Sequence, residues 1–231
     1  MKIAVINFSG NVGKSTVARY LLAPRVKDAS FISVESINAN EGGDSIRGKQ
    51  FGRLSEKLMM SDAAIIDIGS SNVEDFMTLM AQYHGSHDDI DLFVVPTIKE
   101  NKQMRDTIAT IQGLSEMGVS AKKIRVVFNR LEVDESVETA FRPVIAYHED
   151  TKAFTLRTKA AIHYNELYQR LRLYNTSITE LLLDNTDYKS VLKDAKTEAA
   201  RAEAAARISM RRLAASAQAN LDAVFNCIVA R

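Results

Sequence analysis

A short apolar run followed by a glycine-bearing turn and the triplet Lys14-Ser15-Thr16 constrains the fold more than any other feature of this chain. The run is Ile3-Ala4-Val5-Ile6, and the turn is Asn7-Phe8-Ser9-Gly10-Asn11-Val12-Gly13. An apolar-periodic segment begins after the triplet, so the pattern predicts a buried strand, a tight loop and a helix. Glycine lets backbone N–H groups point inward at a helix start, where the helix dipole favours anions. The stretch is therefore typical of a phosphate-binding loop and predicts a nucleotide site.

The chemistry of the loop residues predicts their roles. The Lys14 ammonium would reach the β- and γ-phosphates, and the Ser15 hydroxyl would ligate Mg²⁺. Backbone N–H groups of the loop would hold further phosphate oxygens. The residues expected to contact the nucleotide in this stretch are Gly10, Asn11, Val12, Gly13, Lys14, Ser15 and Thr16.

Length and composition favour a cytoplasmic protein with a sizeable core. The chain has 231 residues, 46% of them hydrophobic, and its net charge of +1 gives no general affinity for nucleic acid. Its single cysteine, Cys227, excludes an intramolecular disulfide and fits a reducing compartment. We find no apolar run of about 20 residues that would cross a bilayer, and no signal peptide before the first strand. We therefore expect a cytoplasmic location without membrane contact.

Further apolar runs predict a doubly wound α/β domain. The expected strands are 29–34, 63–69, 91–96, 123–130 and, as an edge strand, 143–147. The expected helices are about 49–60, 72–82 and 101–117. Alternation of strands and helices favours a mostly parallel sheet with helices on both faces and P-loop topology. We expect this nucleotide-binding domain to occupy residues 1–150.

The third expected strand ends in a carboxylate. Ala64-Ile65-Ile66 is followed by Asp67 and then by Gly69, which is the pattern of a Walker B strand. An aspartate in this position is otherwise a common turn residue. Because the phosphate loop and the carboxylate occur in the proper order, we predict that Ser15 and Asp67 bind Mg²⁺ and that Lys14 and Asp67 take part in catalysis.

Residues 151–231 are expected to form a helical extension. Glycine does not occur after Gly118, and alanine becomes frequent past Ala195. We predict one helix over 164–183 and a much longer one from about Tyr188, with an apolar stripe along one face. The stripe either packs on the domain itself or forms a dimer seam.

The extension carries an excess of positive charge. From Tyr188 onward there are eight Lys and Arg residues against four acids, and Arg207, Arg211 and Arg212 lie close together in sequence. Such a cluster permits nonspecific contact with DNA phosphates, although a solvated helix face has the same pattern.

The loop and the strand ends resemble those of the ParA/MinD family of ATPases, whose deviant Walker A loop reads K-G-G-x-G-K-[ST]. The stretch Ser9-Gly10-Asn11-Val12-Gly13-Lys14-Ser15 follows this frame, with Ser9 at the signature lysine and Asn11 at the second glycine. Within the family, the chain is most similar to plasmid-stability proteins of the StbB type. The resemblance covers roughly residues 1–150 and implies that ATP and Mg²⁺ are the cofactors.

The resemblance also implies roles for residues outside the loop. In the family an asparagine at the end of the fifth strand contacts adenine, so Asn129, followed by Arg130, is expected to bind the base. The family carries aspartates after the second strand that position the attacking water and sense the γ-phosphate. Glu35 stands in that neighbourhood and is the third catalytic candidate.

The function that the resemblance implies is a nucleotide-dependent switch. ATP would order flexible loops, change homodimerisation and change the affinity for DNA or for an operon-encoded DNA-binding adaptor. Because Ser9 is neutral, we expect weak intrinsic ATPase activity or a basic group supplied from elsewhere. The expected role is plasmid partition or DNA positioning, in the cytoplasm or on the nucleoid. Two alternatives stay open: an ATP-dependent small-molecule enzyme of the dethiobiotin-synthetase type, and an adaptor that binds nucleotide without hydrolysing it.

Overall fold

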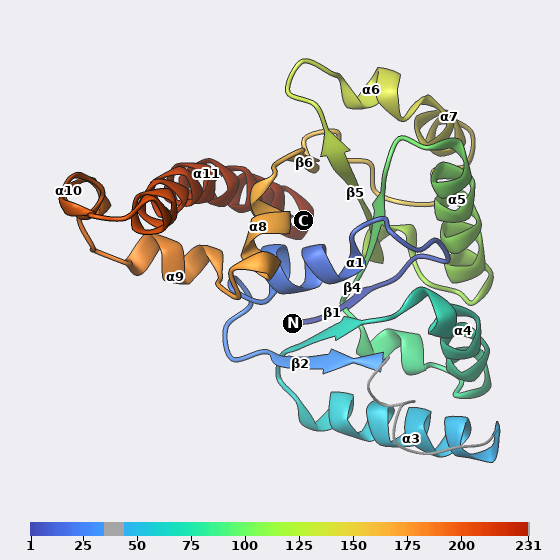
Figure 1. Cartoon of the computed structure of the whole chain (residues 1–231). Coiled ribbons are helices and arrows are strands. Elements are labelled where there is room, and N and C mark those ends of the chain that lie inside the picture. The colour runs from blue at the N-terminus through green and yellow to red at the C-terminus, as the bar shows by residue number, and fades with distance from the viewer. Residues whose placement is uncertain (35–43, 231) are drawn as a thin grey trace.

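The protein is built on a six-stranded sheet with β1 near its centre. The computed structural model describes residues 1–34 and 44–230. In this part of the chain the strand order is β2-β3-β1-β4-β5-β6, and each pair of neighbouring strands is parallel (Figure 1). The strands are β1 (Lys2–Val5), β2 (Ser30–Ser33), β3 (Ala64–Asp67), β4 (Leu92–Thr97), β5 (Ile124–Leu131) and β6 (Ala161–His163). The predicted α/β fold with a parallel sheet is confirmed.

Helices and helical turns connect the strands and form the C-terminal part of the chain. In order they are α1 (Lys14–Thr16), η1 (Val17–Leu22), α3 (Asp44–Met60), η2 (Ser70–Asn72), α4 (Val73–Gln82), η3 (Ser86–Asp89), α5 (Asn101–Glu116), η4 (Ala121–Lys123), α6 (Val137–Ala140), α7 (Arg142–Thr151), α8 (Leu167–Leu173), α9 (Ile178–Leu183), α10 (Tyr188–Asp194) and α11 (Glu198–Val229). Among the described helices, none combines the length and the hydrophobicity needed to span a bilayer.

The chain proceeds from β1 toward both edges of the sheet. β2 and β3 lie on one side of β1, and β4, β5 and β6 lie on the other. In open α/β sheets such a reversal leaves a crevice at the carboxyl ends of the strands, where ligands bind. The loop that follows β1 begins at this point. Asp67, the last residue of β3, pairs in register with Val5, the last residue of β1.

Alternating strand residues bury both faces of the sheet. Ala4 and Ile6 belong to one core cluster, while Ile3 and Val5 belong to the other, because successive side chains of a strand point to opposite faces. The first cluster includes side chains of α3, α4, α5 and α7, and the second includes side chains of η1, α8, α9 and α11. Figure 1 shows these two groups of helices on opposite sides of the sheet.

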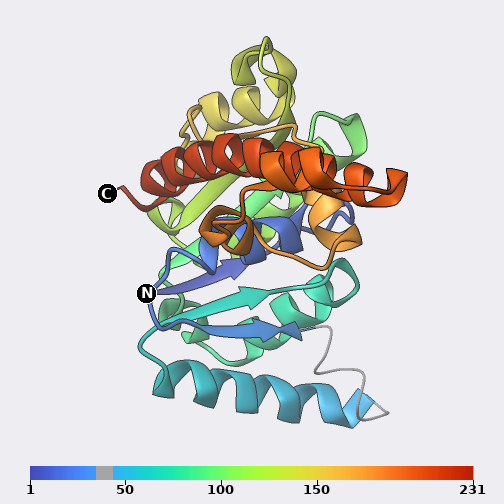
Figure 2. The ribbon, with the colours of Figure 1, turned by 60° about the vertical axis from the view of Figure 1, so that its left-hand side comes forward.

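The C-terminal half of α11 is packed on the second face of the sheet. Its buried residues recur every three or four positions: Met210, Ala214, Ala217, Leu221, Val224 and Ile228. Asn220 of this helix donates to the Ala161 carbonyl (3.0 Å) and accepts from the His163 N–H (3.1 Å), which satisfies the backbone of the short strand β6. Figure 2 shows α11 beside α8 and α9, while α10 and the first turns of α11 extend away from the sheet.

The edge strand predicted at 143–147 is wrong, because these residues form part of α7. Pro143 lies in the first turn of that helix, where its fixed φ is already suitable and its missing N–H is not needed. Val144 and Ile145 are buried, so a short apolar run was consistent with either a strand or a helix. The sixth strand, β6, lies instead at Ala161–His163.

The helices predicted in the extension are interrupted more often than expected. The segment expected as one helix over 164–183 contains α8 and α9, because Ser177 and Glu180 form a capping box that starts a new helix. The helix expected from Tyr188 is likewise divided into α10 and α11. Thr197 caps the second of these by accepting from the Ala200 N–H.

Candidate functional site

The loop between β1 and α1 has the backbone geometry of a phosphate cradle. Asn11 and Gly13 both adopt left-handed conformations, with φ of 61° and 92°. Helix α1 begins directly afterwards, and the Val17 N–H donates to the Gly13 carbonyl at 2.9 Å. Turns of this kind aim consecutive N–H groups into one concavity that binds anions. The described backbone over residues 10–16 therefore fits the predicted phosphate contacts.

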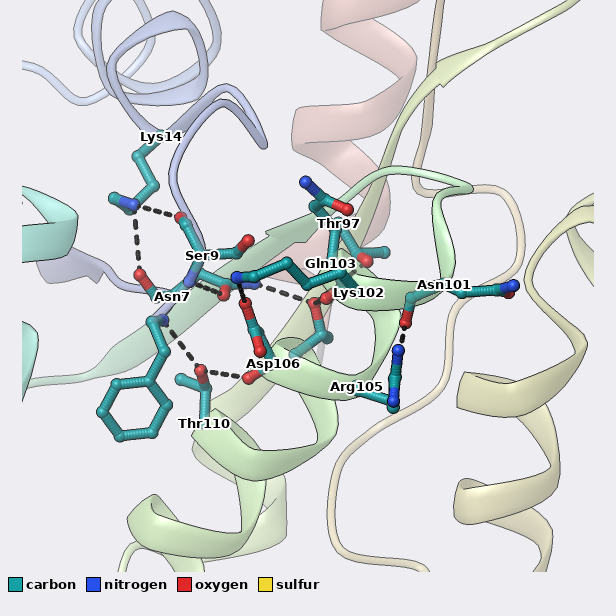
Figure 3. Close-up of polar contacts among 12 residues, drawn as sticks. Asn7, Ser9, Lys14, Thr97, Asn101, Lys102, Gln103, Arg105, Asp106 and Thr110 are labelled. Atoms are coloured by element: carbon teal, nitrogen blue, oxygen red, sulfur yellow. Dashed lines mark hydrogen bonds and ion pairs between the residues drawn. The ribbon is translucent and has the colours of Figure 1, made fainter.

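The side chain of Lys14 turns back along the first half of the loop. Its Nζ donates to the Asn7 carbonyl at 3.1 Å and to the Ser9 carbonyl at 2.7 Å (Figure 3). Only 7% of Lys14 is exposed. The ammonium is therefore held against two carbonyls of the loop, where it could stabilise the negative charge of a phosphate.

Helix α5 supports the first half of the loop through two threonines. Asn7 Nδ2 donates to Thr107 Oγ1 (2.8 Å) and to the Pro96 carbonyl (2.9 Å), and the Phe8 N–H donates to Thr110 Oγ1 (3.1 Å). Asn7 Oδ1 also accepts from the Ser9 N–H at 2.7 Å. The sequence analysis did not identify either threonine, because it considered only the apolar face of this helix. Their spacing of three residues was the available signal, since such residues share a helix face.

Asn129 supports the second half of the loop from the end of β5. Its Nδ2 donates to the Val12 carbonyl at 2.8 Å, and its Oδ1 accepts from the Arg130 N–H at 2.9 Å. Asn129 is buried and lies so close to Gly13 that a Cβ at that position would collide with Asn129 Nδ2. The structure thus brings Asn129 into contact with the loop, and the amide keeps one further N–H and lone pair for a ligand.

Two oxygen-bearing side chains near the loop are the predicted ligands of a magnesium ion. Asp67 is buried at the end of β3, beside the end of β1, and Ser15 lies exposed in the first turn after the loop. Mg²⁺ prefers oxygen ligands and commonly uses one carboxylate, a hydroxyl, phosphate oxygens and water. No group of three or more His, Cys, Asp or Glu residues arranged to hold a metal occurs in the described residues. A metal here would therefore depend on phosphate and water for its remaining ligands.

A cavity of about 740 Å³ opens beside the second half of the loop. It is lined by Thr16, Asn129, Arg130, His163, Tyr164, Asn165, Glu166, Tyr168, Gln169, Arg172 and Leu173. Burial raises the pKa of Tyr168 to about 12, so its phenol stays protonated at neutral pH. The ring of Tyr168 packs against Tyr20 with 5.7 Å between centroids. Aromatic and amide groups together suit a planar, hydrogen-bonding ligand.

Sequence analysis missed most of the residues that line this cavity. They lie at the end of β6, in the connection after it and in α8, whereas the last strand was expected at 143–147. The run Ala160-Ala161-Ile162, followed by a polar stretch, was the signal that marks the correct strand. Thr16, Asn129 and Arg130 were the predicted site residues that line it.

Other predicted residues lie apart from the loop or outside the described part of the chain. Glu35 falls outside the described residues. On the extension, Arg207 lies over the ring of Tyr174 at 5.9 Å, and Arg211 lies over that of Tyr188 at 5.8 Å. Arg211 also donates to the Thr186 carbonyl at 2.7 Å, while Arg212 is exposed. Two of the three arginines therefore take part in packing the extension.

Comparison with known proteins adds solved structures of similar shape. No protein-family model matches the chain, and no curated protein matches it. The matching structures include apo McdA of Cyanothece, with 16% identity, a TM-score of 0.49, and coverage of 78% of this chain and 92% of that one. A variant of Cyanothece McdA in complex with ATP has 14% identity, a TM-score of 0.49 and coverage of 96% of both chains. MinD of Aquifex aeolicus, in its complex with MinC, has 13% identity, a TM-score of 0.49 and coverage of 90% and 95%.

These neighbours are McdA and MinD proteins at low sequence identity, and one of them holds ATP. A likeness at this level carries no conclusion about chemistry. The fold assignment rests on the parallel strand order and on the position of the loop at the end of β1.

Proposed function

We propose that this protein binds ATP with Mg²⁺ in the loop of residues 7–16 and acts as a nucleotide-dependent positioning ATPase of the ParA/MinD type. One observation carries the proposal. The Lys14 ammonium lies within the left-handed loop after β1, 2.7 Å from the Ser9 carbonyl, at the point where the strand order reverses. An ammonium within a cradle of N–H groups at a helix start suits the β- and γ-phosphates of a nucleotide.

The neighbouring residues would divide the remaining contacts. The backbone from Gly10 to Thr16 would hold phosphate oxygens, and Ser15 and Asp67 would hold Mg²⁺, which supplies positive charge to the β- and γ-phosphates. The base would enter the cavity beside Asn129 and Arg130, where the phenol of Tyr168 is a neutral donor. Lys14, Asp67 and Glu35 remain the proposed catalytic residues. We propose slow intrinsic hydrolysis, because the side chain at Ser9 carries no charge.

The two parts of the chain would have different tasks. We propose that residues 1–150 hold the phosphates and the metal, and that residues 163–173 at the start of the extension line the cavity for the base. The rest of the extension over 151–231 would communicate the state of the nucleotide. Nucleotide-dependent homodimerisation, an operon-encoded adaptor and nonspecific DNA contact through Arg212, beside Arg207 and Arg211, belong to this proposal, as does nucleoid association. The particular role proposed is plasmid stability or partition, and its support is the resemblance of the loop to that of StbB-type proteins.

Titration calorimetry with ATP and Mg²⁺ tests the nucleotide site. Lys14→Ala should weaken binding roughly 10- to 100-fold, because it removes a charged hydrogen-bond donor to the phosphates. Lys122→Ala is the matched control. Lys122 is exposed and precedes β5, so it lies at the amino ends of the strands, whereas the loop lies at their carboxyl ends. If Lys14→Ala bound ATP as tightly as the unmodified protein, the proposed site would be wrong.

Two further measurements separate the candidate roles. Light scattering with and without ATP reports dimerisation, and phosphate release reports hydrolysis. ATP binding without release of phosphate would favour a nucleotide-switched adaptor. Loss of a reporter plasmid from cells that carry the Lys14→Ala variant would support partition, whereas unchanged plasmid retention would contradict that role.

A further inference from the structure

The first turns of α5 lie directly against the first half of the loop. Thr107 and Thr110 bind Asn7 and Phe8, so this face of α5 is fixed on the loop by buried hydrogen bonds. Asp106 lies on the same face, beside Thr107 and one turn before Thr110. Figure 3 shows Asp106 and Lys102 projecting from the helix toward the Ser9 part of the loop.

Lys102 and Asp106 form an ion pair next to Ser9. Lys102 Nζ donates to Asp106 Oδ2 at 2.7 Å. The hydrogen bond from Lys102, together with a weaker one from the Ser9 side chain, holds the pKa of Asp106 below its ordinary value. The side chain of Lys102 is 72% exposed, whereas that of Asp106 is 26% exposed. Asp106 therefore links an exposed ammonium to the loop.

Helix stability does not account for this ion pair. Lys102 is the second residue of α5, in the first turn, where the positive end of the helix dipole disfavours a cation. The pair also has lysine before the acid, which is the less stabilising order for residues four apart. A choice that opposes local preference is expected mainly where a residue has a functional role.

The Ser9 end of the loop is the end that would face the terminal phosphate. Lys14 Nζ, the group expected to reach the β- and γ-phosphates, donates to the Ser9 carbonyl at 2.7 Å. The cavity that suits the base lies at the other end, beside Thr16 and Asn129. A triphosphate lying along the loop would therefore bring its last phosphate toward Ser9 and α5.

We propose that Lys102 is a second phosphate-binding ammonium. When a nucleoside triphosphate binds, Lys102 would exchange its ion pair with Asp106 for a contact with the terminal phosphate. This inference rests on the proposed function and names a further residue of that site. A terminal phosphate offers several charged oxygens in place of one carboxylate, and the long, flexible lysine stem allows the exchange. When no triphosphate is bound, Asp106 holds the Lys102 ammonium in the ion pair and so competes with the phosphate for it.

Binding of two nucleotides to one set of variants tests the proposal. We would titrate the full chain with a nonhydrolysable ATP analogue and with ADP, both with Mg²⁺. Lys102→Ala should weaken the analogue about tenfold and change ADP affinity by less than about twofold, because only the analogue carries the terminal phosphate. Lys102→Arg should retain most of the analogue's affinity, since it keeps the charge. Lys122→Ala is the control with the same chemical change at a distant surface.

Three outcomes would overturn the inference. The first is an unchanged ratio of analogue to ADP affinity in Lys102→Ala. The second is an equal loss for both nucleotides together with a lower melting temperature, which would show a structural role. The third is a loss of analogue affinity in Asp106→Asn as large as that in Lys102→Ala, which would show that binding depends on the intact ion pair. We expect instead that Asp106→Asn keeps or raises the analogue's affinity, because it releases Lys102.

The same titrations separate this inference from the proposed function. If Lys14→Ala abolishes binding while Lys102→Ala leaves the ratio of analogue to ADP affinity unchanged, only the proposed role of Lys102 is wrong. If the unmodified protein binds neither nucleotide, the proposed function fails and the inference fails with it.

Discussion

The two halves of the loop are supported in different ways. The first half, residues 7–9, is connected to α5 and β4 by several side-chain hydrogen bonds, including those of Thr107 and Thr110. In the described part of the chain, the second half, Val12 and Gly13, is supported by the side chain of Asn129 and by a backbone conformation that glycine adopts easily. The first half therefore resists the loss of one contact, while the second half depends on the absence of a Cβ at one position.

Replacement of Gly13 should distort the second half of the loop and have the largest effect on stability and ATP binding. Gly13→Ala places a Cβ at φ 92° and against Asn129 Nδ2, so both the loop backbone and Asn129 must move. We expect a loss of about 2–4 kcal/mol in the free energy of unfolding, and ATP binding too weak to detect by calorimetry. Chemical denaturation measures the stability.

Gly85→Ala is the control for Gly13→Ala. Gly85 has a similar φ of 84°, but a Cβ there would meet nothing within 4 Å. It should therefore show only the backbone cost of about 1–2 kcal/mol and normal ATP binding. Equal effects of the two substitutions would mean that contact with Asn129 is unimportant.

Removal of the Asn7 side chain should weaken the first half strongly. Asn7 is fully buried and makes hydrogen bonds with Pro96, Thr107 and Ser9. We expect Asn7→Ala to lower the free energy of unfolding by about 2–3 kcal/mol, because it leaves buried polar groups without partners. Thr107→Val removes one of these bonds, along with the bonds of its hydroxyl to Thr97 and to the Gln103 carbonyl, and should cost about 1–2 kcal/mol. If both variants lose the same free energy of unfolding, the support of the loop is not divided among several hydrogen bonds.

Removal of the Asn129 side chain should destabilise the second half of the loop by a smaller amount. Asn129→Ala leaves the Val12 carbonyl without its donor and should cost about 1–2 kcal/mol of stability. We expect ATP affinity to fall about tenfold, because the amide would also face the base. Calorimetry measures the affinity, and Arg142→Ala, on an exposed surface of α7, serves as the unaffected control. Full ATP affinity in Asn129→Ala would contradict this role.

The smallest expected effect concerns pH and the pair at α5. Because its folded pKa lies below the ordinary value of 3.8, Asp106 stabilises the fold above that value and loses this contribution as pH falls through the lower, folded pKa. Asp106→Asn should therefore show a slightly shallower loss of stability below about pH 4 than the unmodified protein. Denaturation curves from pH 3 to 7 measure this difference, and identical curves would show that the pair contributes nothing to the fold.

The positions in the fold of the candidate site residues at strand ends could be predicted from the sequence. The loop from Gly10 to Thr16, the carboxylate at Asp67 and the amide at Asn129 all lie at strand ends, and a parallel sheet brings such ends to one edge. The strand–loop–helix order around Lys14 is a local pattern that packing does not override.

The remaining parts were not predictable because they depend on long-range contacts. Thr107 and Thr110 are about a hundred residues from Asn7 and Phe8, and nothing local shows that a helical threonine supports a distant backbone group. The cavity residues after His163 were missed because the run at 143–147, ambiguous between strand and helix, was assigned as the last strand. Short apolar runs carry too little periodicity to decide between the two.

A crystal structure of the protein with a nonhydrolysable ATP analogue and Mg²⁺ would show whether the loop of residues 7–16 is the nucleotide site. We expect the triphosphate within the loop of residues 7–16, its terminal phosphate toward Ser9 and Lys102, the metal between Ser15 and Asp67, and the base beside Asn129. A nucleotide bound elsewhere, or a loop that closes over Lys14 and leaves no place for phosphate, would contradict the account.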